Sequence, residues 1–468
     1  MTYDAIVVGA RIGGATTALL LAQRGYSVLL LDQDRFPSGT LSTHLFFTDT
    51  MDVFERIGVL DRVLAVDAPR LRRLKFPYVD APFAERNGRD FALCIRRETL
   101  DALLVEAAAA EPQIELRTGT RVTGLLWDDG RPSGVRLRAV GSQDESEIAG
   151  RFIIGADGRN SLIAREVGAT AYHVVPALFA WYYAYFVGVP LDDPPSAMAA
   201  RLASYPAVGA DYGASFVFPT DAGLTLVGFG VQHDAFRRFR EQYREHFREG
   251  ISLVPSVSAR IGDARLEGAI VGTGDLPNFL RTPAGPGWAL VGDAGSHKDP
   301  HTVQGMGDAT RSALLLVDAL DRCWRGEISE VQALERYRLA RDADILPLYD
   351  FTTGRLEAAF DPESGKNTVV LPGRTRTWRA HALPRWPMPY RLRRSIPSPQ
   401  YVARSRGMYR LAGNSVCLTS IVSNAGEILA RSWLLSARLT WRARSDSVLS
   451  QWRITWCLDQ SQRRQRGN

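Results

Sequence analysis

The sequence predicts an α/β fold in which a Rossmann-like parallel-sheet domain carries an inserted antiparallel sheet. A glycine-rich turn separates two short apolar segments near the N-terminus. Two later segments, RFIIGADGR at 151–159 and WALVGDAGSHKDPHTVQGMGD at 288–308, each pass from an apolar run into a turn that contains Gly and Asp. Between these two segments lie aromatic stretches of strand length. Together these observations indicate one discontinuous parallel sheet with a second sheet inserted into it.

The N-terminal elements are a strand, a turn, a helix and a second strand. Ala5–Val8 and Tyr26–Leu31 have the apolar composition of strands buried on both faces. Ala15–Gln23 is rich in alanine and leucine and predicts a helix, which Gly25 ends. The free N–H groups at the start of this helix would face the turn and favour an anion there.

The turn itself reads GARIGG. Gly9 and Gly14 fill the first and third glycine positions of a dinucleotide-binding turn, whereas Arg11 fills the second. We expect Arg11 to be tolerated if its φ is negative and its side chain leans outward, where it would place a cation near the phosphates. Asp32 ends the second strand, where a carboxylate can accept hydrogen bonds from a ribose. The unit is therefore predicted to bind a dinucleotide, and an ordinary βαβ unit without a ligand is the alternative.

Composition indicates a large intracellular protein with an unusual C-terminal region. The chain has 468 residues, and 45% of them are hydrophobic, which is enough for two domains. Its four cysteines have no C-x-x-C spacing, and His44, His297 and His301 are not spaced as helix-borne ligands, so we expect neither disulfides nor a metal site. We find no signal-like segment or transmembrane segment, and we expect a cytoplasmic location. The cysteines are Cys94, Cys323, Cys417 and Cys457.

The positive charge is confined to the C-terminal region. Residues 363–468 carry 19 Lys and Arg against 4 Asp and Glu, together with six of the ten tryptophans, whereas residues 1–362 have a net charge of −9. The basic balance therefore does not indicate that the body binds nucleic acid. We interpret 362–468 as a basic, Arg/Trp-rich tail that is poorly packed, in the manner of an altered reading frame. A selected extension that binds RNA or a membrane surface is the alternative.

The glycine turn, the Asp-Gly turn at 157–158 and the Gly-Asp pair at 292–293 resemble, in this order and spacing, the class A flavoprotein monooxygenases that include para-hydroxybenzoate hydroxylase. GDAGSHKDP and SFVFPTDAGLTLVGFG are also similar to the geranylgeranyl reductase branch. The resemblance implies an FAD/NAD(P)-binding domain with an inserted substrate domain. It places the FAD domain at 1–70, 96–172 and 273–361, and the substrate sheet at 71–95 and 173–272.

The resemblance also assigns cofactor residues. Gly9, Gly14 and Asp32 would hold the pyrophosphate and ribose of FAD, and Arg97 would contact the phosphate or ribityl chain. Asp293 would accept from the ribityl hydroxyls, and the N–H groups of 305–307 would face the flavin ring. Asp157 would lie near the nicotinamide path, although a turn and helix cap explain it nearly as well. The full expected set is Gly9, Arg11, Gly14, Asp32, Arg35, Arg97, Val122, Asp157, Asp293, Gly305 and Gly307.

The implied reaction is hydroxylation or epoxidation of an aromatic, polyketide-like or other apolar small molecule of secondary metabolism, with O2 and with NAD(P)H as transient reductant. Aromatic residues at 179–189 and 215–231 are expected on both faces of the sheet, some lining the substrate cavity. His44 and His297 are the acid–base candidates, because histidine titrates near neutrality.

Three alternatives stay open. The first is an FAD-dependent reductase of prenyl double bonds. The second is a halogenase, which is disfavoured because the body lacks W-x-W-x-I-P and has only Lys75 and Lys298. The third, not an enzyme, is nucleic-acid or membrane-surface binding through the tail.

Overall fold

The computed structural model describes residues 2–76, 79–359, 437–439 and 454–456. The chain divides into two units, Met1–Trp386 and Pro387–Asn468. In the second unit, β22 (Ala437–Leu439) pairs antiparallel with β23 (Ile454–Trp456). The rest of the basic tail lies outside the described residues, so its packing stays a prediction.

The first unit is organised around a six-stranded sheet in the order β19-β20-β11-β1-β2-β7. All neighbours in it are parallel except β19, which runs antiparallel to β20. The strands are β1 (Ala5–Val8), β2 (Val28–Leu31), β7 (Ile114–Arg117), β11 (Ile153–Gly155), β19 (Ala284–Gly285) and β20 (Trp288–Leu290). The chain leaves the carboxyl ends of β1, β11 and β20 through the glycine turn, the Asp-Gly turn and the Gly-Asp loop, so these three motifs meet at one edge.

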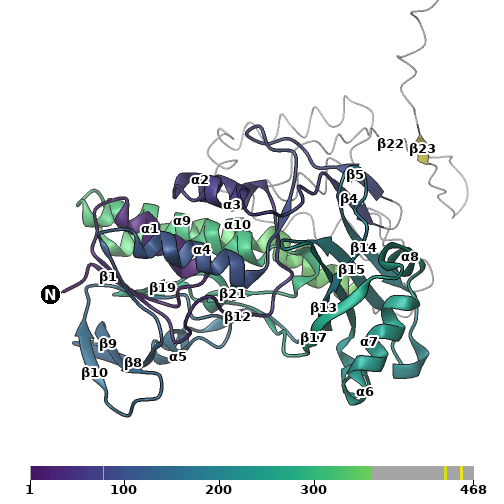
Figure 1. Ribbon diagram of the computed structural model, residues 1–468. Helices are drawn as coiled ribbons and strands as arrows, with labels where there is room; N and C mark the ends of the chain where they lie inside the picture. The colour runs from purple at the N-terminus through teal and green to yellow at the C-terminus, as the bar shows by residue number, and fades with distance from the viewer. Residues whose placement is uncertain (1, 77–78, 360–436, 440–453, 457–468) are drawn as a thin grey trace, which may run out of the picture. The chain divides into compact units, whose positions relative to one another are not determined.

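Helices cover one face of this sheet, and a small antiparallel sheet covers the other (Figure 1). The helical layer buries a continuous apolar core against β1 and β2. It contains α1 (Ile12–Ala22), α2 (Thr48–Arg56), α3 (Leu60–Leu64), α4 (Arg97–Ala109), α9 (Gly305–Trp324) and α10 (Glu330–Ala359). The opposite layer contains β8 (Thr120–Asp128), β9 (Arg131–Ala139), β10 (Ser146–Ala149) and α5 (Leu162–Glu166).

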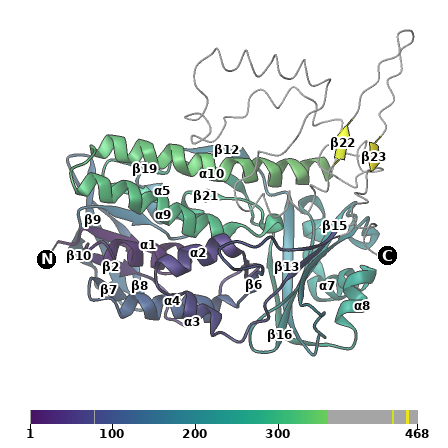
Figure 2. The same cartoon turned by 90° about the horizontal axis from the view of Figure 1, so that it is seen from above.

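A seven-stranded sheet in the order β17-β13-β16-β15-β14-β4-β5 lies at the other end of the first unit (Figure 2). Its strands are β4 (Arg73–Phe76), β5 (Val79–Pro82), β13 (Phe179–Val187), β14 (Ser196–Leu202), β15 (Gly213–Pro219), β16 (Leu224–Gln232) and β17 (Arg265–Thr273). Helices α6 (Phe236–Glu241), α7 (Tyr243–Ser252) and α8 (Pro255–Ile261) complete its core. The predicted α/β class is confirmed. The inserted sheet is mixed rather than purely antiparallel, because β14 and β4 run parallel.

Short elements connect the two sheets. One of them is a three-stranded sheet of β12 (Ala171–Val175), β18 (Asn278–Arg281) and β21 (Ser296–His297). The other is a two-stranded sheet in which β3 (Leu45–Phe46) pairs with β6 (Leu93–Cys94). The short 3-10 turns are η1 (Pro206–Val208), η2 (His233–Ala235), η3 (Gly292–Ala294) and η4 (Pro300–Thr302). Within the described ranges, no helix is both long and apolar enough to cross a bilayer.

A buried carboxylate fastens the seven-stranded sheet to the parallel-sheet domain. Asp221, in the turn between β15 and β16, accepts hydrogen bonds from the Arg96 backbone N–H (2.8 Å) and the Thr99 hydroxyl (2.7 Å) at the start of α4. Burial opposes ionisation of Asp221, but these hydrogen bonds outweigh it and lower its pKa. We call Asp221, Arg96 and Thr99 the Asp221 clamp.

Candidate functional site

The glycine turn tolerates no side chain at its first and third glycines. Gly9 has φ +101°, and a Cβ there would lie 2.4 Å from the Ala156 carbonyl oxygen. A Cβ on Gly14 would lie 1.7 Å from the Gly9 carbonyl oxygen. The glycine turn therefore packs directly against the start of the Asp-Gly turn, which requires bare backbone at both positions.

Arg11 has the negative φ that we expected (−74°), but its side chain binds other groups of the protein. Its guanidinium forms ion pairs with Asp34 (2.7 Å) and Asp101 (2.9 Å) and donates to the Ser38 carbonyl oxygen (3.2 Å). The cation is thus neutralised by two carboxylates instead of standing free for a phosphate. Arg11 joins the loop after β2 to α4.

Arg97 shares the same buried partner. It lies in the first turn of α4 with 9% of its surface exposed and pairs with Asp101 (2.9 Å), which is fully buried. Arg11 contacts Oδ2 of Asp101 and Arg97 contacts both of its oxygens, so the two arginines neutralise this carboxylate jointly.

Asp32 holds the turn and retains acceptor capacity. Its two oxygens accept from the Ala10 N–H (2.7 Å) and the Asp34 N–H (2.8 Å), and burial raises its pKa. Each carboxylate oxygen has a second lone pair, which a ribose hydroxyl can use. Arg35 is exposed and lies against Gly119. The Val122 side chain is buried beneath the sheet, so only its backbone is available to a nucleotide.

Asp157, which follows β11, and Asp293, which follows β20, have different surroundings. The Asp157 carboxylate accepts from the Ser161 hydroxyl (2.5 Å) and the Leu162 N–H (2.7 Å), and burial raises its pKa. It caps α5, as the turn-and-cap alternative proposed. Asp293 is exposed on η3, and no described residue forms a hydrogen bond or ion pair with its carboxylate. Asp293 is therefore available to a ligand, whereas Asp157 is committed to the fold.

Helix α9 begins at Gly305, so both predicted glycines lie in its first turn and not before it. Open space surrounds the Gly305 Cα, and its N-cap residue Gln304 makes no capping hydrogen bond. The free N–H groups of this turn can therefore face a ligand. A Cβ on Gly307 would lie 2.7 Å from the Arg311 guanidinium, so this glycine is required by the protein itself.

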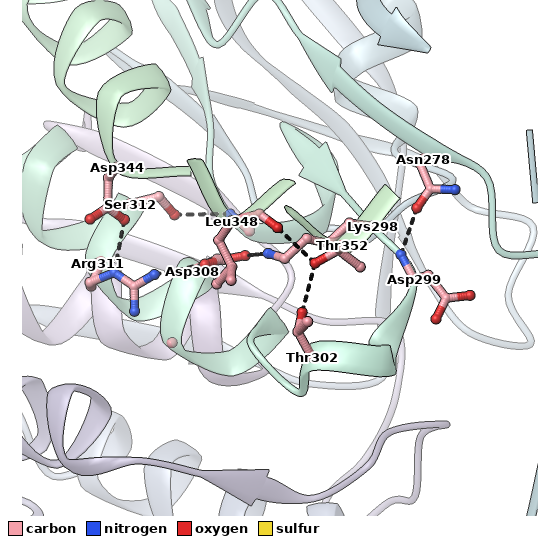
Figure 3. A network of polar contacts seen from close by, with 12 residues as sticks. Asn278, Lys298, Asp299, Thr302, Asp308, Arg311, Ser312, Asp344, Leu348 and Thr352 are labelled. Carbon is pink, nitrogen blue, oxygen red and sulfur yellow. Dashed lines mark hydrogen bonds and ion pairs between the residues drawn. The ribbon is translucent and has the colours of Figure 1, made fainter. Parts of the chain in front are cut away.

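A buried ion network supports this turn (Figure 3). Lys298 pairs with Asp308, and Arg311 pairs with Asp308 (2.7 Å), Asp344 (2.8 Å) and Asp49. Because these residues come from α2, α9, α10 and the loop before η4, the network fixes the loop against three helices. Lys298 is consequently a buried structural cation whose charge Asp308 neutralises.

One face of the seven-stranded sheet is aromatic. Along β13, Tyr182 and Phe186 pack on α6 and α7, whereas Trp181, Tyr183 and Tyr185 point to the opposite face. Directly paired residues share a face, so that face gathers aromatic rings from β13 and β15 around two glycines of β16. The rings lean over the bare glycine backbone, where a Cβ would lie 2.1–2.6 Å from them. We call this set the aromatic face: Trp181, Tyr183, Tyr185, Phe216, Phe218, Gly228 and Gly230.

His44 lies against the aromatic face. Its Nε2 hydrogen-bonds to the Tyr185 hydroxyl (2.7 Å), and its Nδ1 is buried without a partner. Burial, assisted by the Arg97 charge, lowers the pKa of His44 to about 3. The expectation that His44 titrates near neutrality is therefore wrong. It is a neutral imidazole that can still donate or accept a hydrogen bond.

His297 has a different environment. It lies on β21, where its Nδ1 hydrogen-bonds to the Pro277 carbonyl oxygen (2.5 Å) and its ring stacks on Phe279. The structure thus places His44 in the loop before β3 and His297 on β21, and it gives His297 a local structural partner. Its catalytic role stays a prediction.

Asp299 was missed by the sequence reading. It is 1% exposed, and its Oδ1 accepts from the Trp181 indole N–H (3.2 Å) and from the His301 N–H (2.9 Å). Burial raises its pKa to about 7. The only local signal was the Lys-Asp-Pro sequence inside a glycine-rich loop, which does not distinguish this acid from an ordinary turn residue.

Residues 2–241 match the family model of the FAD binding domain. The chain belongs to this family. The match covers the glycine turn, the Asp-Gly turn and most of the seven-stranded sheet, so the resemblance to flavoprotein monooxygenases is confirmed at the level of the family, and the individual FAD-binding residues stay predictions.

Curated relatives of this FAD protein carry several activities. The chain is 24% identical over 339 residues to a tryptophan 2-halogenase of Chondromyces crocatus, covering 71% of this chain and 64% of that protein's length. It is 26% identical over 344 residues to a digeranylgeranylglycerophospholipid reductase of Methanosarcina mazei, covering 72% and 79%. It is 32% identical over 188 residues to the aklavinone 12-hydroxylase DnrF of Streptomyces peucetius, covering 36% and 38%. All three names denote oxidoreductases, and the chain is a flavin-dependent oxidoreductase by family.

Solved structures share the fold. The myxobacterial chondrochloren halogenase CndH superposes with a TM-score of 0.69 at 21% identity, covering 92% of this chain and 96% of the other. PqsL of Pseudomonas aeruginosa, a probable FAD-dependent monooxygenase, superposes with a TM-score of 0.63 at 20% identity, covering 78% and 99%. These likenesses establish the architecture and leave the reaction open.

The residues of this chain fit an FAD. The bare glycine turn, the spare lone pairs of Asp32, the unpartnered Asp293 carboxylate and the uncapped first turn of α9 are the groups that a flavin dinucleotide requires. Within the described residues, no group of three His, Cys, Asp or Glu side chains is arranged for a metal.

Proposed function

We propose that this protein is an FAD-dependent monooxygenase that uses NAD(P)H and O2 to hydroxylate or epoxidise an aromatic, polyketide-like or other apolar small molecule. The observation that carries the proposal is the convergence of the flavin-binding edge and the aromatic face. His44 reaches Tyr185 from the loop after β2, and Asp299 reaches Trp181 from the loop after η3. Both loops belong to the FAD domain, so the cofactor's site and the aromatic face share a boundary.

Within this proposal, Gly9, Gly14 and Asp32 hold the pyrophosphate and ribose, and Asp293 binds the ribityl chain. The N–H groups of the α9 first turn would face the flavin ring, where their partial positive charge would stabilise electron density. When bound, FAD supplies two-electron transfer and activation of O2. The protein binds and orients the substrate on the aromatic face and excludes water from it.

Arg11 and Arg97 have a supporting role in this proposal. Because both are paired with Asp101, they fix the loop after β2 and α4 around the dinucleotide. The described residues contain one parallel sheet with a glycine turn, so NAD(P)H would bind transiently on the same domain.

An absorption spectrum tests the cofactor assignment. Purified protein, or protein reconstituted with FAD, is expected to bind flavin noncovalently and to lose the oxidised flavin bands when NADH or NADPH is added without O2. Protein that binds no flavin, or that binds NAD in its place, would overturn the proposal.

The likeness to the digeranylgeranylglycerophospholipid reductase favours a second candidate, the reduction of prenyl double bonds. The halogenase names favour a third. Against halogenation, Lys75 pairs with Asp192 (2.9 Å) and Lys298 is buried against Asp308, so both lysines of residues 2–359 are held by carboxylates. O2 consumption in the presence of an aromatic substrate, with and without bromide, distinguishes the three. A monooxygenase consumes O2 without halide, a halogenase makes a brominated product, and a prenyl reductase saturates its substrate without net O2 uptake.

A further inference from the structure

Asp299 is a buried carboxyl group that forms no ion pair with a cation of the described residues. It lies between η3 and α9, in the loop that the family assignment places at the flavin, and it contacts Trp181 of the aromatic face. Lys298, the neighbouring cation, points away from it toward Asp308 (Figure 3). The carboxyl thus sits at the boundary of the two domains with its charge uncompensated.

The two oxygens of Asp299 are not equivalent. Oδ1 accepts both the Trp181 indole N–H and the His301 backbone N–H, whereas Oδ2 is buried and has no hydrogen-bond partner. A proton on this carboxyl therefore belongs on Oδ2, because Oδ1 already faces two donors. A buried O–H without an acceptor is costly, and an oxygen of a bound ligand would supply the acceptor that the described residues lack.

The surroundings hold Asp299 rigidly. Its backbone N–H donates to the Asn278 side-chain oxygen (2.7 Å), and the Asn278 amide donates to the Pro176 carbonyl oxygen (2.9 Å). The described groups that contact the carboxyl are the Trp181 indole N–H from β13 and the His301 backbone N–H on η4, and the His301 ring lies beside the Trp181 ring (centroids 6.1 Å apart). The neighbouring charges of Lys298 and Asp308 neutralise each other. The position of Oδ2 is therefore set by β18 and β13 and not by a flexible loop.

We propose that Asp299 is an acid–base residue of the flavin site, and that its Oδ2 exchanges a proton with a hydroxyl group of an aromatic substrate bound on the aromatic face. In the forward step the substrate O–H bond breaks, the proton goes to the Asp299 carboxylate, and the electron pair stays on the substrate oxygen. This makes the ring electron-rich, which favours attack by an electrophile. The inference rests on the proposed monooxygenase function.

The burial that isolates the carboxyl also raises its pKa into the range where a general base works at neutral pH. His44 was the expected base, but its lowered pKa keeps the imidazole neutral throughout this pH range.

The test uses Asp299→Asn in the flavin-loaded full chain. An asparagine keeps an acceptor toward Trp181 and His301 and presents an N–H donor where Oδ2–H would be, so it mimics the protonated acid without exchanging a proton. With a phenol as probe, we expect wild-type turnover to rise about tenfold per pH unit below the Asp299 pKa and to level off above it. Asp299→Asn should lose this rise and fall by roughly 10²–10³-fold at pH 8.

A second variant and a binding measurement separate the outcomes. Trp181→Phe keeps an aromatic ring but removes the donor to Oδ1, so it should move the pH midpoint upward and leave the rise in place. Binding of the phenol, followed through the flavin spectrum, should change less than fivefold in Asp299→Asn. An unchanged pH profile in a flavin-loaded Asp299→Asn protein would overturn the role of Asp299 alone, whereas a wild-type protein without flavin would overturn the proposed function itself.

Discussion

The flavin-binding edge and the aromatic face assemble their functional groups in different ways. At the edge, the important groups are backbone N–H groups, bare glycines and acids that immediately follow strands. At the aromatic face, the important groups are side chains whose properties come from distant partners: His44 is 141 positions from Tyr185, and Asp299 is 118 positions from Trp181. The difference teaches that a nucleotide site can be encoded locally, whereas an acid–base site is produced by burial and long-range contact.

Gly14→Ala is the strongest test of the locally encoded edge. The added methyl would lie 1.7 Å from the Gly9 carbonyl oxygen, so the turn cannot keep its geometry. We expect loss of FAD binding, measured by flavin content, together with a lower yield of folded protein. Gly39→Ala is the matched control, because nothing lies within 4 Å of its Cβ position. Normal flavin content in Gly14→Ala would contradict the assignment of this turn.

The acid sensitivity of His44 tests the aromatic face. Its folded pKa of about 3 lies below the ordinary value of 6.5, so the unfolded chain binds a proton here that the folded chain does not. The free energy of unfolding should therefore decrease by up to roughly 3–5 kcal/mol as the pH falls from 6.5 to 3. His44→Asn, which tolerates the positive φ of this position, should flatten the dependence in pH-resolved urea unfolding. Tyr185→Phe keeps the imidazole and should retain this pH dependence. If the unfolding free energy depends equally on pH in the wild type and both variants, the loss of stability in acid comes from other groups.

Asp293 and Asp157 offer a matched pair at the edge. Asp293→Ala removes a ligand-facing carboxylate and should weaken FAD by about 1.5–3 kcal/mol with little change in the melting temperature of the apoprotein. Asp157→Ala removes the acceptor of the Leu162 and Ile163 N–H groups at the start of α5 and should cost about 0.5–2 kcal/mol of stability. Flavin titration and thermal unfolding of both variants check this. If Asp293→Ala binds FAD with wild-type affinity, the ribityl assignment fails.

Arg11→Gly is expected to have the smallest effect, although it restores the usual glycine. The substitution removes the ion pairs to Asp34 and Asp101, but Asp101 keeps Arg97 as partner. We expect a loss of about 1–2 kcal/mol in unfolding free energy. Arg35→Ala, an exposed position on the same loop, should stay within about 0.5 kcal/mol. A more stable Arg11→Gly protein would mean that the arginine is only tolerated.

The sequence was informative where local geometry decides the outcome. The strand at Ala5–Val8 was predicted with its observed bounds, and the turn-and-cap alternative for Asp157 agrees with the hydrogen bond that it accepts from the Leu162 N–H. The N–H groups of 305–307, which were singled out in the sequence, lie in the first turn of α9. Asp299 carried only the weak Lys-Asp-Pro signal, since its raised pKa arises from burial by residues that are distant in the sequence.

The Asp221 clamp has a mechanical consequence. To swing the seven-stranded sheet away from α4, the protein would have to strip a buried carboxylate of its hydrogen bonds from Arg96 and Thr99, which is costly. We therefore expect the two sheets to behave as one stiff frame, with admission of reactants left to the loops on either side of it. Reactants would then enter through movement of these loops, while the two sheets keep their relative orientation.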